Sequence, residues 1–392
     1  MSRLALVSVS LSLIALAACA DDGAVDGGGD ETSTSTTGDG DGDAEGMTTT
    51  GTEDPSTSGD GDGDPSGDGD PTTTGDGDGD PTTTGDGDGD PTGDGDGDGD
   101  GDGDTLLRFI AIGDAGEGNS GQYNVAAAIE SICADKGGCE FVLYLGDNFY
   151  DDGVASVDDD QFQTKFEMPY ADLSLPFWIT MGNHDYGILS FAWEKLAYEV
   201  EYTNYSDKWT MLDKWYVIDQ YPNLDIFVLD TTRLMWDHET SSQRAWLEQQ
   251  LAASDKPWKI AIGHHPYFSN GEHGNAGNYE GFPFPPQLAG TDVKDFMDDK
   301  MCGEVDLYLS GHDHNRQWHQ GTCSGGSTTT HFIVSGAGCK TTDFAYHAGG
   351  NDVYWEDDTT PGLLLLELQG NELYTAFYDE NANLQYERTI TK

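Results

Sequence analysis

The sequence predicts a mixed α/β fold, a four-layer αββα sandwich in which two mixed β-sheets pack together and helices flank them. Two observations support this prediction. The first half of the folded region alternates short apolar runs with amphipathic segments, an order typical of βα units. After residue 330 come four runs in which apolar and polar residues alternate, as in antiparallel strands. The chain therefore begins as α/β and ends rich in strands.

The individual elements follow from these patterns in chain order. Apolar runs predict strands at 106–112, 141–145, 176–181, 215–218, 224–230, 258–262 and 305–309. Amphipathic helices are expected at 119–135, at 240–251 behind a capping box formed by Thr240 and Gln243, and at 292–301. The later, alternating strands are expected at 331–334, 363–367, 372–377 and 384–389. The long loops between these elements are the segments that usually carry function.

Composition divides the 392 residues into three parts, namely a signal peptide at 1–19, a spacer at 20–104 and one folded domain at 105–392. The first part has a short basic start and an apolar stretch too short to span a bilayer, which is typical of a signal sequence. It ends in Leu-Ala-Ala-Cys19, which resembles the lipobox of bacterial lipoproteins. We expect an exported bacterial lipoprotein, anchored to the outer membrane or cell surface by lipid on Cys19. Ordinary secretion after cleavage at the small residues is the alternative.

The spacer repeats Gly-Asp and Asp-Pro-Thr-Thr-Thr-Gly units and has almost no apolar side chains. Nothing in it can offset the entropy lost on ordering, so we expect disorder, extended by repulsion between aspartates. The aspartate runs also suggest calcium loops, but the distant glutamate that completes an EF-hand is missing.

Charge excludes two classes of partner. The net charge is −56, and residues 105–392 alone hold 45 acidic against 16 basic side chains. Nucleic acids and anionic membrane surfaces bind through basic patches, so neither is expected as a partner of the domain. The expected partner is a small molecule, and the domain is expected to be monomeric.

Residues able to bind metal ions follow several of the predicted strands at the point where each strand ends. They are Asp114, Asp147, Tyr150, Asn183, His264, His312 and His314. In open sheets, ligands gather at the carboxyl ends of the strands. Oxygen and imidazole donors suit iron, zinc or manganese. The sequence therefore predicts a metal centre at this edge of the sheets.

The motifs GDAG, GDNFY, GNHDY, AIGHHP and GHDHN hold these residues. In this order they resemble the calcineurin-like metallophosphoesterases, and among them the small purple (tartrate-resistant) acid phosphatases, over most of residues 105–345. The resemblance implies hydrolysis of phosphate monoesters at acidic pH, in a metallophosphoesterase fold. It also implies a binuclear Fe(III)–M(II) centre with metal-bound hydroxide as the nucleophile.

One departure from the wider superfamily assigns the ligands. Most of its members begin with Asp-x-His, whereas this chain has Asp114-Ala115-Gly116 and lacks that histidine. In the purple phosphatases a tyrosine three residues after the bridging aspartate replaces it, and Tyr150 stands there. The resemblance then implies two sites with Asp147 as bridge. Fe(III) would bind Asp114, Asp147, Tyr150 and His314, and a divalent Fe, Zn or Mn would bind Asn183, His264 and His312.

Two further histidines remain for the substrate. The resemblance implies that His184 and His273 hold the phosphoryl group and protonate the leaving alkoxide, as imidazoles can, with Asp185 orienting His184. We interpret His265 as a supporting residue beside the ligands. The other four histidines are expected to be ordinary polar positions, namely His238, His319, His331 and His347.

Beyond Cys19 the chain has an odd number of cysteines, so at least one thiol is expected to stay free. Cys133 with Cys139, and Cys302 with Cys323, are plausible disulfides, but sequence alone leaves the pairing open, and five buried thiols are the alternative.

Two other functions remain open at this stage. The same metals could serve a phosphodiesterase or nucleotide phosphatase, and the acidic repeats could belong to a calcium-binding surface adhesin.

Overall fold

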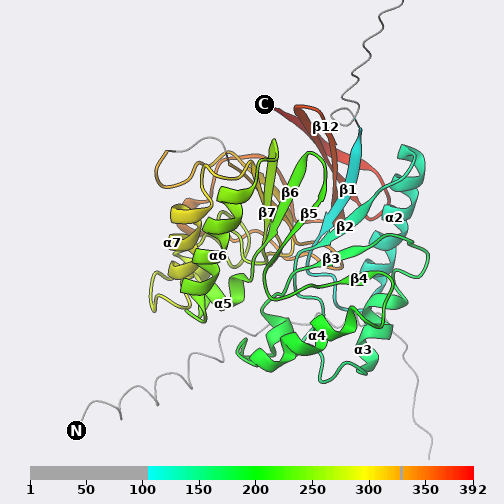
Figure 1. Cartoon of the computed structure of the whole chain (residues 1–392), viewed down its shortest axis with the longest axis horizontal. Helices are drawn as coiled ribbons and strands as arrows, with labels where there is room; N and C mark the ends of the chain where they lie inside the picture. The colour runs from blue at the N-terminus through cyan, green and yellow to red at the C-terminus, as the bar shows by residue number, and fades with distance from the viewer. Residues whose placement is uncertain (1–104, 327–329) are drawn as a thin grey trace, which may run out of the picture. The chain divides into compact units, whose positions relative to one another are not determined.

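The structure is a computed structural model, and it describes residues 105–326 and 330–392. The predicted signal peptide with Cys19 and the predicted spacer lie outside the described residues. The described part contains two seven-stranded sheets. Figure 1 shows the strands of both sheets in the middle, with helices on the two outer sides.

The first sheet combines strands from the beginning and the end of the described residues. Its order is β14 (Leu384–Thr391), β13 (Glu372–Asp379), β12 (Gly362–Gln369), β1 (Leu107–Ile112), β2 (Phe141–Tyr144), β3 (Phe177–Ile179), β4 (Trp209–Thr210). The strands β1 to β4 are parallel neighbours, whereas β12 pairs with β1 in antiparallel register. The carboxyl ends of β1, β2 and β3 therefore meet at one edge.

The second sheet is also mixed. Its order is β11 (Val353–Asp357), β9 (Arg316–His319), β10 (His331–Ser335), β8 (Leu307–Ser310), β7 (Trp258–Ile262), β6 (Leu224–Val228), β5 (Tyr216–Tyr221). The strands β6, β7, β8 and β10 are parallel, so their carboxyl ends also share an edge. Residues 316–319 and 353–357 form strands that the sequence patterns do not predict.

Helices cover the outer face of each sheet. The α-helices of the described residues are α2 (Ser120–Lys136), α3 (Asp160–Phe162), α4 (Leu196–Tyr202), α5 (Thr231–Met235), α6 (Thr240–Ala253) and α7 (Thr291–Lys300). In Figure 1, α2 lies beside the first sheet and α6 and α7 lie beside the second. This arrangement confirms the predicted four-layer αββα sandwich of two mixed sheets. In the described part of the chain, no helix is long and apolar enough to cross a membrane.

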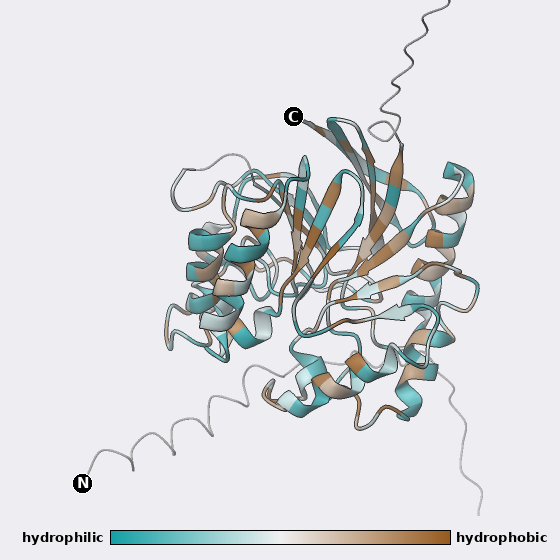
Figure 2. Ribbon diagram, viewed as in Figure 1, coloured by the Kyte–Doolittle hydropathy of each residue, from teal (hydrophilic) through white to brown (hydrophobic). Residues whose placement is uncertain are grey.

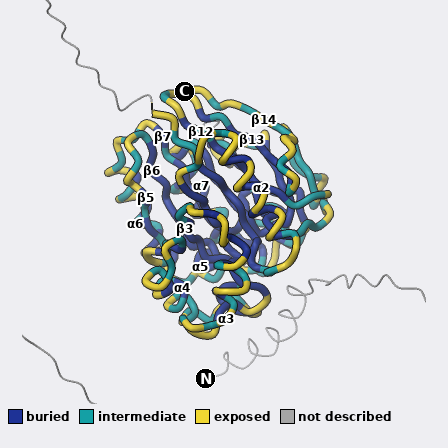
Figure 3. The backbone as a smooth tube through the Cα atoms, turned by 90° about the vertical axis from the view of Figure 1, so that its right-hand side faces the viewer, coloured by how far each residue is buried: buried dark blue, intermediate teal, exposed yellow. Residues whose placement is uncertain are grey.

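Apolar strands form the core between the sheets. Hydrophobic residues concentrate on the central strands in Figure 2, and the same strands are buried in Figure 3. One detail differs from the expected alternation, because the first five residues of β12 are all buried. This strand lies between β1 and β13, so both of its faces are covered. It therefore has the continuous apolar pattern of a central strand.

The predicted capping box of α6 is wrong. The residue before the helix is Glu239 in a left-handed conformation, and it makes no side-chain capping hydrogen bond. The Gln243 side chain instead accepts a hydrogen bond from the Asp230 backbone N–H at 2.9 Å and donates one to the Asp230 carbonyl at 3.0 Å. Gln243 thus attaches α6 to the segment just after β6. It also pairs the buried N–H and carbonyl groups of Asp230, which would be costly to leave without a hydrogen bond.

The structure resolves the open question of the cysteines. Cys133 is bonded to Cys139, and Cys302 to Cys323, so the second disulfide links the end of α7 to the loop after β9. Cys339 is a buried free thiol. Each disulfide closes a loop and limits the unfolded chain, which is a usual source of stability in exported proteins.

Candidate metal centre

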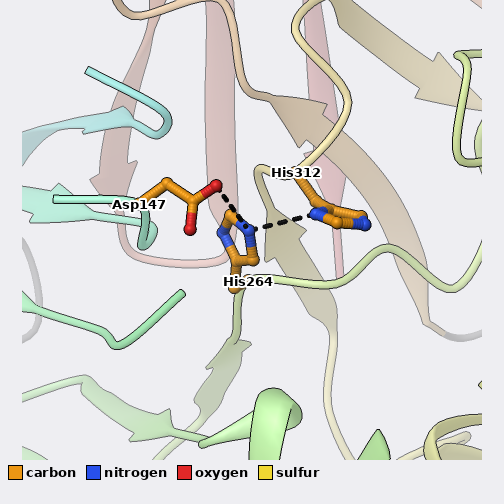
Figure 4. A group of neighbouring side chains, drawn as sticks. All are labelled: Asp147, His264 and His312. Atoms are coloured by element: carbon orange, nitrogen blue, oxygen red, sulfur yellow. Dashed lines mark hydrogen bonds and ion pairs between the residues drawn. The ribbon is translucent and has the colours of Figure 1, made fainter. Parts of the chain in front are cut away.

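Seven predicted ligands come from five loops at the shared edge of the sheets. Asp114 follows β1, Asp147 and Tyr150 follow β2, and Asn183 follows β3. His264 follows β7, and both His312 and His314 follow β8. Asp147, His264 and His312 are buried, and one ligand atom of each lies within 4.8 Å of the others. Figure 4 shows these three side chains near one another, each on a loop that follows a separate strand.

Apart from Asp147, the predicted ligands divide into two groups. In the first, the Tyr150 hydroxyl lies 3.1 Å from Asp114 Oδ1 and 3.0 Å from His314 Nε2. In the second, His264 Nε2 lies 3.0 Å from Asn183 Oδ1 and 3.2 Å from His312 Nδ1. The structure thus brings all seven predicted residues together.

Asp147 contacts His264 of the second group and raises the pKa of Asp114 in the first. Its Oδ2 lies 3.3 Å from His264 Nε2. Burial and then repulsion from Asp147 raise the pKa of Asp114 to about 8, although attraction to His264 opposes the rise. Burying two carboxylates that repel each other is costly unless a positive charge offsets them. The donor atoms and their charges therefore fit one or more bound cations.

The electrostatics of His264 fit the same conclusion. Burial opposes its protonation, but Asp147 and Asp114 raise its pKa to about 9. An imidazole must be neutral to bind a metal ion, so a cation competes with this proton. The ring is oriented for that role because His264 Nδ1 lies 2.9 Å from the Leu145 carbonyl oxygen, which leaves Nε2 facing the other ligands.

The backbone that presents these ligands is strained. Asp114, Asp147 and His312 have φ angles of 57°, 52° and 70°, which are uncommon outside glycine. Neighbouring glycines permit the close approach of the loops. A Cβ at Gly182 would lie 2.2 Å from Asp147 Oδ1, and one at Gly311 would lie 2.2 Å from Asp114 Oδ2. Such strain persists where surrounding structure enforces it, most often at functional sites.

Asp185 does not orient His184, contrary to the sequence-based expectation. It is fully buried and accepts hydrogen bonds from the backbone N–H groups of Asn148, Phe149 and Gly182. Asn183 lies just before the short 3-10 helix His184–Tyr186, in which Asp185 is buried and His184 is not. The carboxylate thus fastens the β3 loop to the β2 loop, and His184 Nδ1 contacts the Asp151 carbonyl oxygen at 2.8 Å.

His184 and His273 lie next to different halves of the centre. The His184 ring centroid is 4.6 Å from that of Tyr150, and the His273 ring stacks on His312 at 4.0 Å. His273 Nδ1 also lies 2.5 Å from Glu280 Oε1. Burial opposes a charge on His273, but this hydrogen bond and nearby carboxylates raise its pKa to about 10.

Asp313 builds the loop that carries His273. Its Oδ1 accepts a hydrogen bond from the His273 backbone N–H at 2.8 Å, and its Oδ2 accepts one from Gly274 at 3.3 Å. Asp313 stands between the two histidines of the GHDHN motif, so one turn fixes two ligands and the His273 loop. Neither Asp313 nor Glu280 is predicted as a site residue from the sequence. The position of Asp313 inside a motif was the only available signal.

The other histidines divide by position. His265 is buried behind the ligands, with its ring 4.4 Å from that of His312 and its Nδ1 2.9 Å from Thr231 Oγ1. His347 contacts the His273 loop, because its Nε2 lies 2.6 Å from the Glu272 carbonyl oxygen. His238 stacks on Trp193 away from the ligands.

Comparisons with known proteins agree with this geometry. A profile of the calcineurin-like phosphoesterase family matches residues 107–316. Tartrate-resistant acid phosphatase type 5 of Sus scrofa is 29% identical over 261 residues, covering 59% of this chain and 70% of the relative. Purple acid phosphatase 17 of Arabidopsis thaliana is 30% identical over 263 residues, covering 60% and 70%.

A solved structure shares the fold. GAP50, the anchor in the inner membrane complex of Plasmodium, aligns with a TM-score of 0.57 and 21% identity over 73% of this chain and 89% of its own. The resemblance expected from the motifs is confirmed, and the homology supports phosphoester hydrolysis with divalent metal use. The chain belongs to the calcineurin-like phosphoesterase family.

Proposed function

We propose that the protein is a purple-type acid phosphatase that hydrolyses small phosphate monoesters at a binuclear centre of Fe(III) and a divalent Fe, Zn or Mn. The observation that carries this proposal is the Tyr150 hydroxyl, 3.1 Å from Asp114 Oδ1 and 3.0 Å from His314 Nε2. A phenolate is a hard anion and suits a trivalent ion better than a divalent one. Tyr150 would supply the ligand that is missing because Gly116 replaces the histidine of the usual Asp-x-His motif.

The two groups of side chains give each ion its own ligands. Asp114, Tyr150 and His314 would hold Fe(III), and Asn183, His264 and His312 would hold the divalent ion. Asp147 would bridge them. When bound, such a pair of ions activates water and compensates charge on the phosphoryl oxygens. Two carboxylates and one phenolate do not cancel five metal charges, so the site attracts an anionic ester.

The chain's own residues supply the remaining chemistry. His273 and His184 would contact the phosphoryl group and give a proton to the leaving oxygen. Glu280 holds the His273 ring through Nδ1, so Nε2 is left to donate. An acidic optimum follows from the substrate, since a phosphate monoester loses its second charge below about pH 6. The acidic domain, with 45 acidic and 16 basic side chains, then repels it less.

The visible colour of the protein tests the metal assignment. We expect purified protein to be purple or pink, and Tyr150→Phe to lose the colour, because the band arises from charge transfer between the phenolate and Fe(III). Metal analysis and the visible spectrum are the measurements. Tyr144→Phe is the matched control, because Tyr144 is also a buried tyrosine but is not one of the proposed ligands. The Tyr144→Phe protein should stay coloured. A colourless, fully active dizinc enzyme would refute the assignment.

Glu280→Gln tests the role of His273. We expect the alkaline limb of the kcat/KM profile to move to lower pH, because loss of the carboxylate lowers the pKa of His273 from about 10. The loss in kcat should be larger for an alkyl phosphate than for p-nitrophenyl phosphate, whose leaving group needs less protonation.

Glu272→Gln is the matched control for the Glu280 variant. Glu272 is exposed and next to His273 in the chain. Its substitution by Gln removes the same charge without breaking the side-chain hydrogen bond to the His273 ring, which is made by Glu280. Its profile should move less. Equal shifts in the two variants, or none in either, would remove His273 from the proton transfer.

We also propose that residues 1–19 are a lipoprotein signal, that lipid on Cys19 anchors the protein, and that the catalytic domain begins at residue 105. Cys19→Ala should leave an uncleaved or soluble product in fractionated cells, because no thiol remains to carry lipid. Deletion of residues 21–104 should leave kcat and KM unchanged. Soluble, folded but inactive deletion protein would show that the acidic repeats take part in catalysis.

A further inference from the structure

A lysine ammonium group lies over the ring of the tyrosine proposed to bind Fe(III). Lys340 Nζ is 3.9 Å from the centroid of the Tyr150 ring. The same nitrogen also lies 2.8 Å from Glu117 Oε1. The Lys340 side chain is 21% exposed, so water screens this contact only in part. The motifs that mark the family do not include this lysine, and the function argued above does not use it.

The segment around Lys340 is built onto the Fe(III) half of the centre. The Gly338 backbone N–H donates to the Gly113 carbonyl oxygen at 3.0 Å, and the Cys339 thiol donates to the Asp114 carbonyl oxygen at 2.9 Å. Two residues beyond Lys340, the Thr342 N–H donates to the His314 carbonyl oxygen at 2.9 Å. The segment thus holds the backbones of two proposed ligands and directs the ammonium group at the ring of the third.

We propose that Lys340 sets the electronic properties of the Tyr150–Fe(III) pair through the field of its ammonium group. This inference rests on the proposed function, because it requires a Tyr150 phenolate bound to Fe(III). A cation over an aromatic face is attracted by the ring electrons, and more so when the ring carries phenolate charge. Lys340 is therefore a positioning and tuning residue that touches neither substrate nor metal.

Two measurable effects follow from the sign of the charge. Excitation of the visible band moves electron density from the ring to the metal, which leaves the ring more positive beside Lys340. The lysine therefore raises the transition energy, and its removal should move the band to longer wavelength. The same positive charge favours Fe(II) over Fe(III), so its removal should also lower the reduction potential of the iron.

The experiment compares full-length variants after iron loading is shown to be equal by metal analysis. Lys340→Met should shift the visible maximum to longer wavelength by roughly tens of nanometres, the scale of a unit charge acting at about 4 Å in a partly screened site. Its reduction potential should fall. Lys340→Arg keeps the charge and should stay close to the wild-type spectrum and potential. Lys340→Gln provides a second neutral variant if the methionine variant does not fold.

Lys165→Met is the matched control. Lys165 Nζ donates to the Tyr150 backbone carbonyl oxygen. This variant therefore removes a positive charge that lies beside the backbone of Tyr150 and not over its ring. Its band should move much less than that of Lys340→Met. A purple wild type with an unmoved band in both neutral Lys340 variants would overturn this proposal alone. A colourless, iron-free wild type would overturn it together with the proposed function.

Discussion

Asp147→Asn is expected to lower kcat/KM for an aryl phosphate by on the order of 10³-fold or more, beyond the 10–100-fold typical of residues that only support metal ligands. The substitution keeps the size of the side chain but removes a negative charge from the proposed bridge. Asp147 is also the carboxylate that faces His264 and repels Asp114. Both metals should therefore bind more weakly, and metal analysis should show less than full content of each.

Asp225→Asn is a suitable control for the bridging variant. Asp225 is buried in β6 and contributes a carboxylate that no predicted ligand contacts. The Asp225→Asn protein should keep full metal content, and its activity should stay within a few-fold of wild type. This result would show that the loss in Asp147→Asn comes from the bridging position and not from removing a buried carboxylate in general. Asp147→Asn protein that holds two metals and keeps activity within tenfold would show that Asp147 is not the bridge.

The ligands could be predicted from the sequence because each lies directly after an apolar strand. Parallel strands of one sheet place their carboxyl ends at a common edge, so the first sheet alone brings Asp114, Asp147 and Asn183 near one another. The ligand histidines follow strands of the second sheet, and it is the packing of the two sheets that brings them to the same place. The two disulfides could only be suggested from the sequence, which left the pairing open until the structure showed Cys133 bonded to Cys139 and Cys302 bonded to Cys323. Tyr150 needed a further observation, namely the missing histidine of Asp-x-His.

The strand β9 shows why other parts of the fold were missed. It contains Arg316, Gln317, Trp318 and His319, yet all four are buried. Arg316 is neutralised by Asp357 at 2.6 Å and also donates to the Tyr378 carbonyl oxygen. Partners that lie about 40 and 60 residues away convert a polar sequence into a core strand, and no local pattern contains that information.

The supporting residues of the site were inaccessible for a related reason. Glu280 lies in a Gly- and Pro-rich loop, and Lys340 lies after β10, far from Tyr150 in the sequence. Neither has a periodic signal, and only the folded chain brings them to His273 and Tyr150. The error on Asp185 has the opposite origin, because adjacency to His184 suggested a contact that the short 3-10 helix prevents.

His319→Phe is expected to make the protein more resistant to acid. His319 is 1% exposed, and in the described part of the chain neither ring nitrogen has a hydrogen-bond partner. Burial lowers its pKa to about 3, whereas an unfolded histidine has a pKa of about 6.5. The unfolded state therefore takes up the proton first as the pH falls. Stability from neutral His319 is present above pH 6.5 and is lost as the pH falls toward 3.

The full loss of unfolding free energy over this window is on the order of 5 kcal/mol, at about 1.4 kcal/mol per pH unit. Phenylalanine cannot take up a proton, and the site is lined by aromatic rings such as Phe268, 6.0 Å away between centroids. The stability difference between His319→Phe and wild type should therefore grow steadily from pH 7 to pH 4.5, as measured by denaturant unfolding. His238→Phe, the same substitution at a 39% exposed histidine, is the control for the replacement itself. Parallel curves for His319→Phe and wild type would mean that His319 is already protonated or hydrated in the folded protein. An enzyme proposed to work in acid would then carry no stability penalty from this residue.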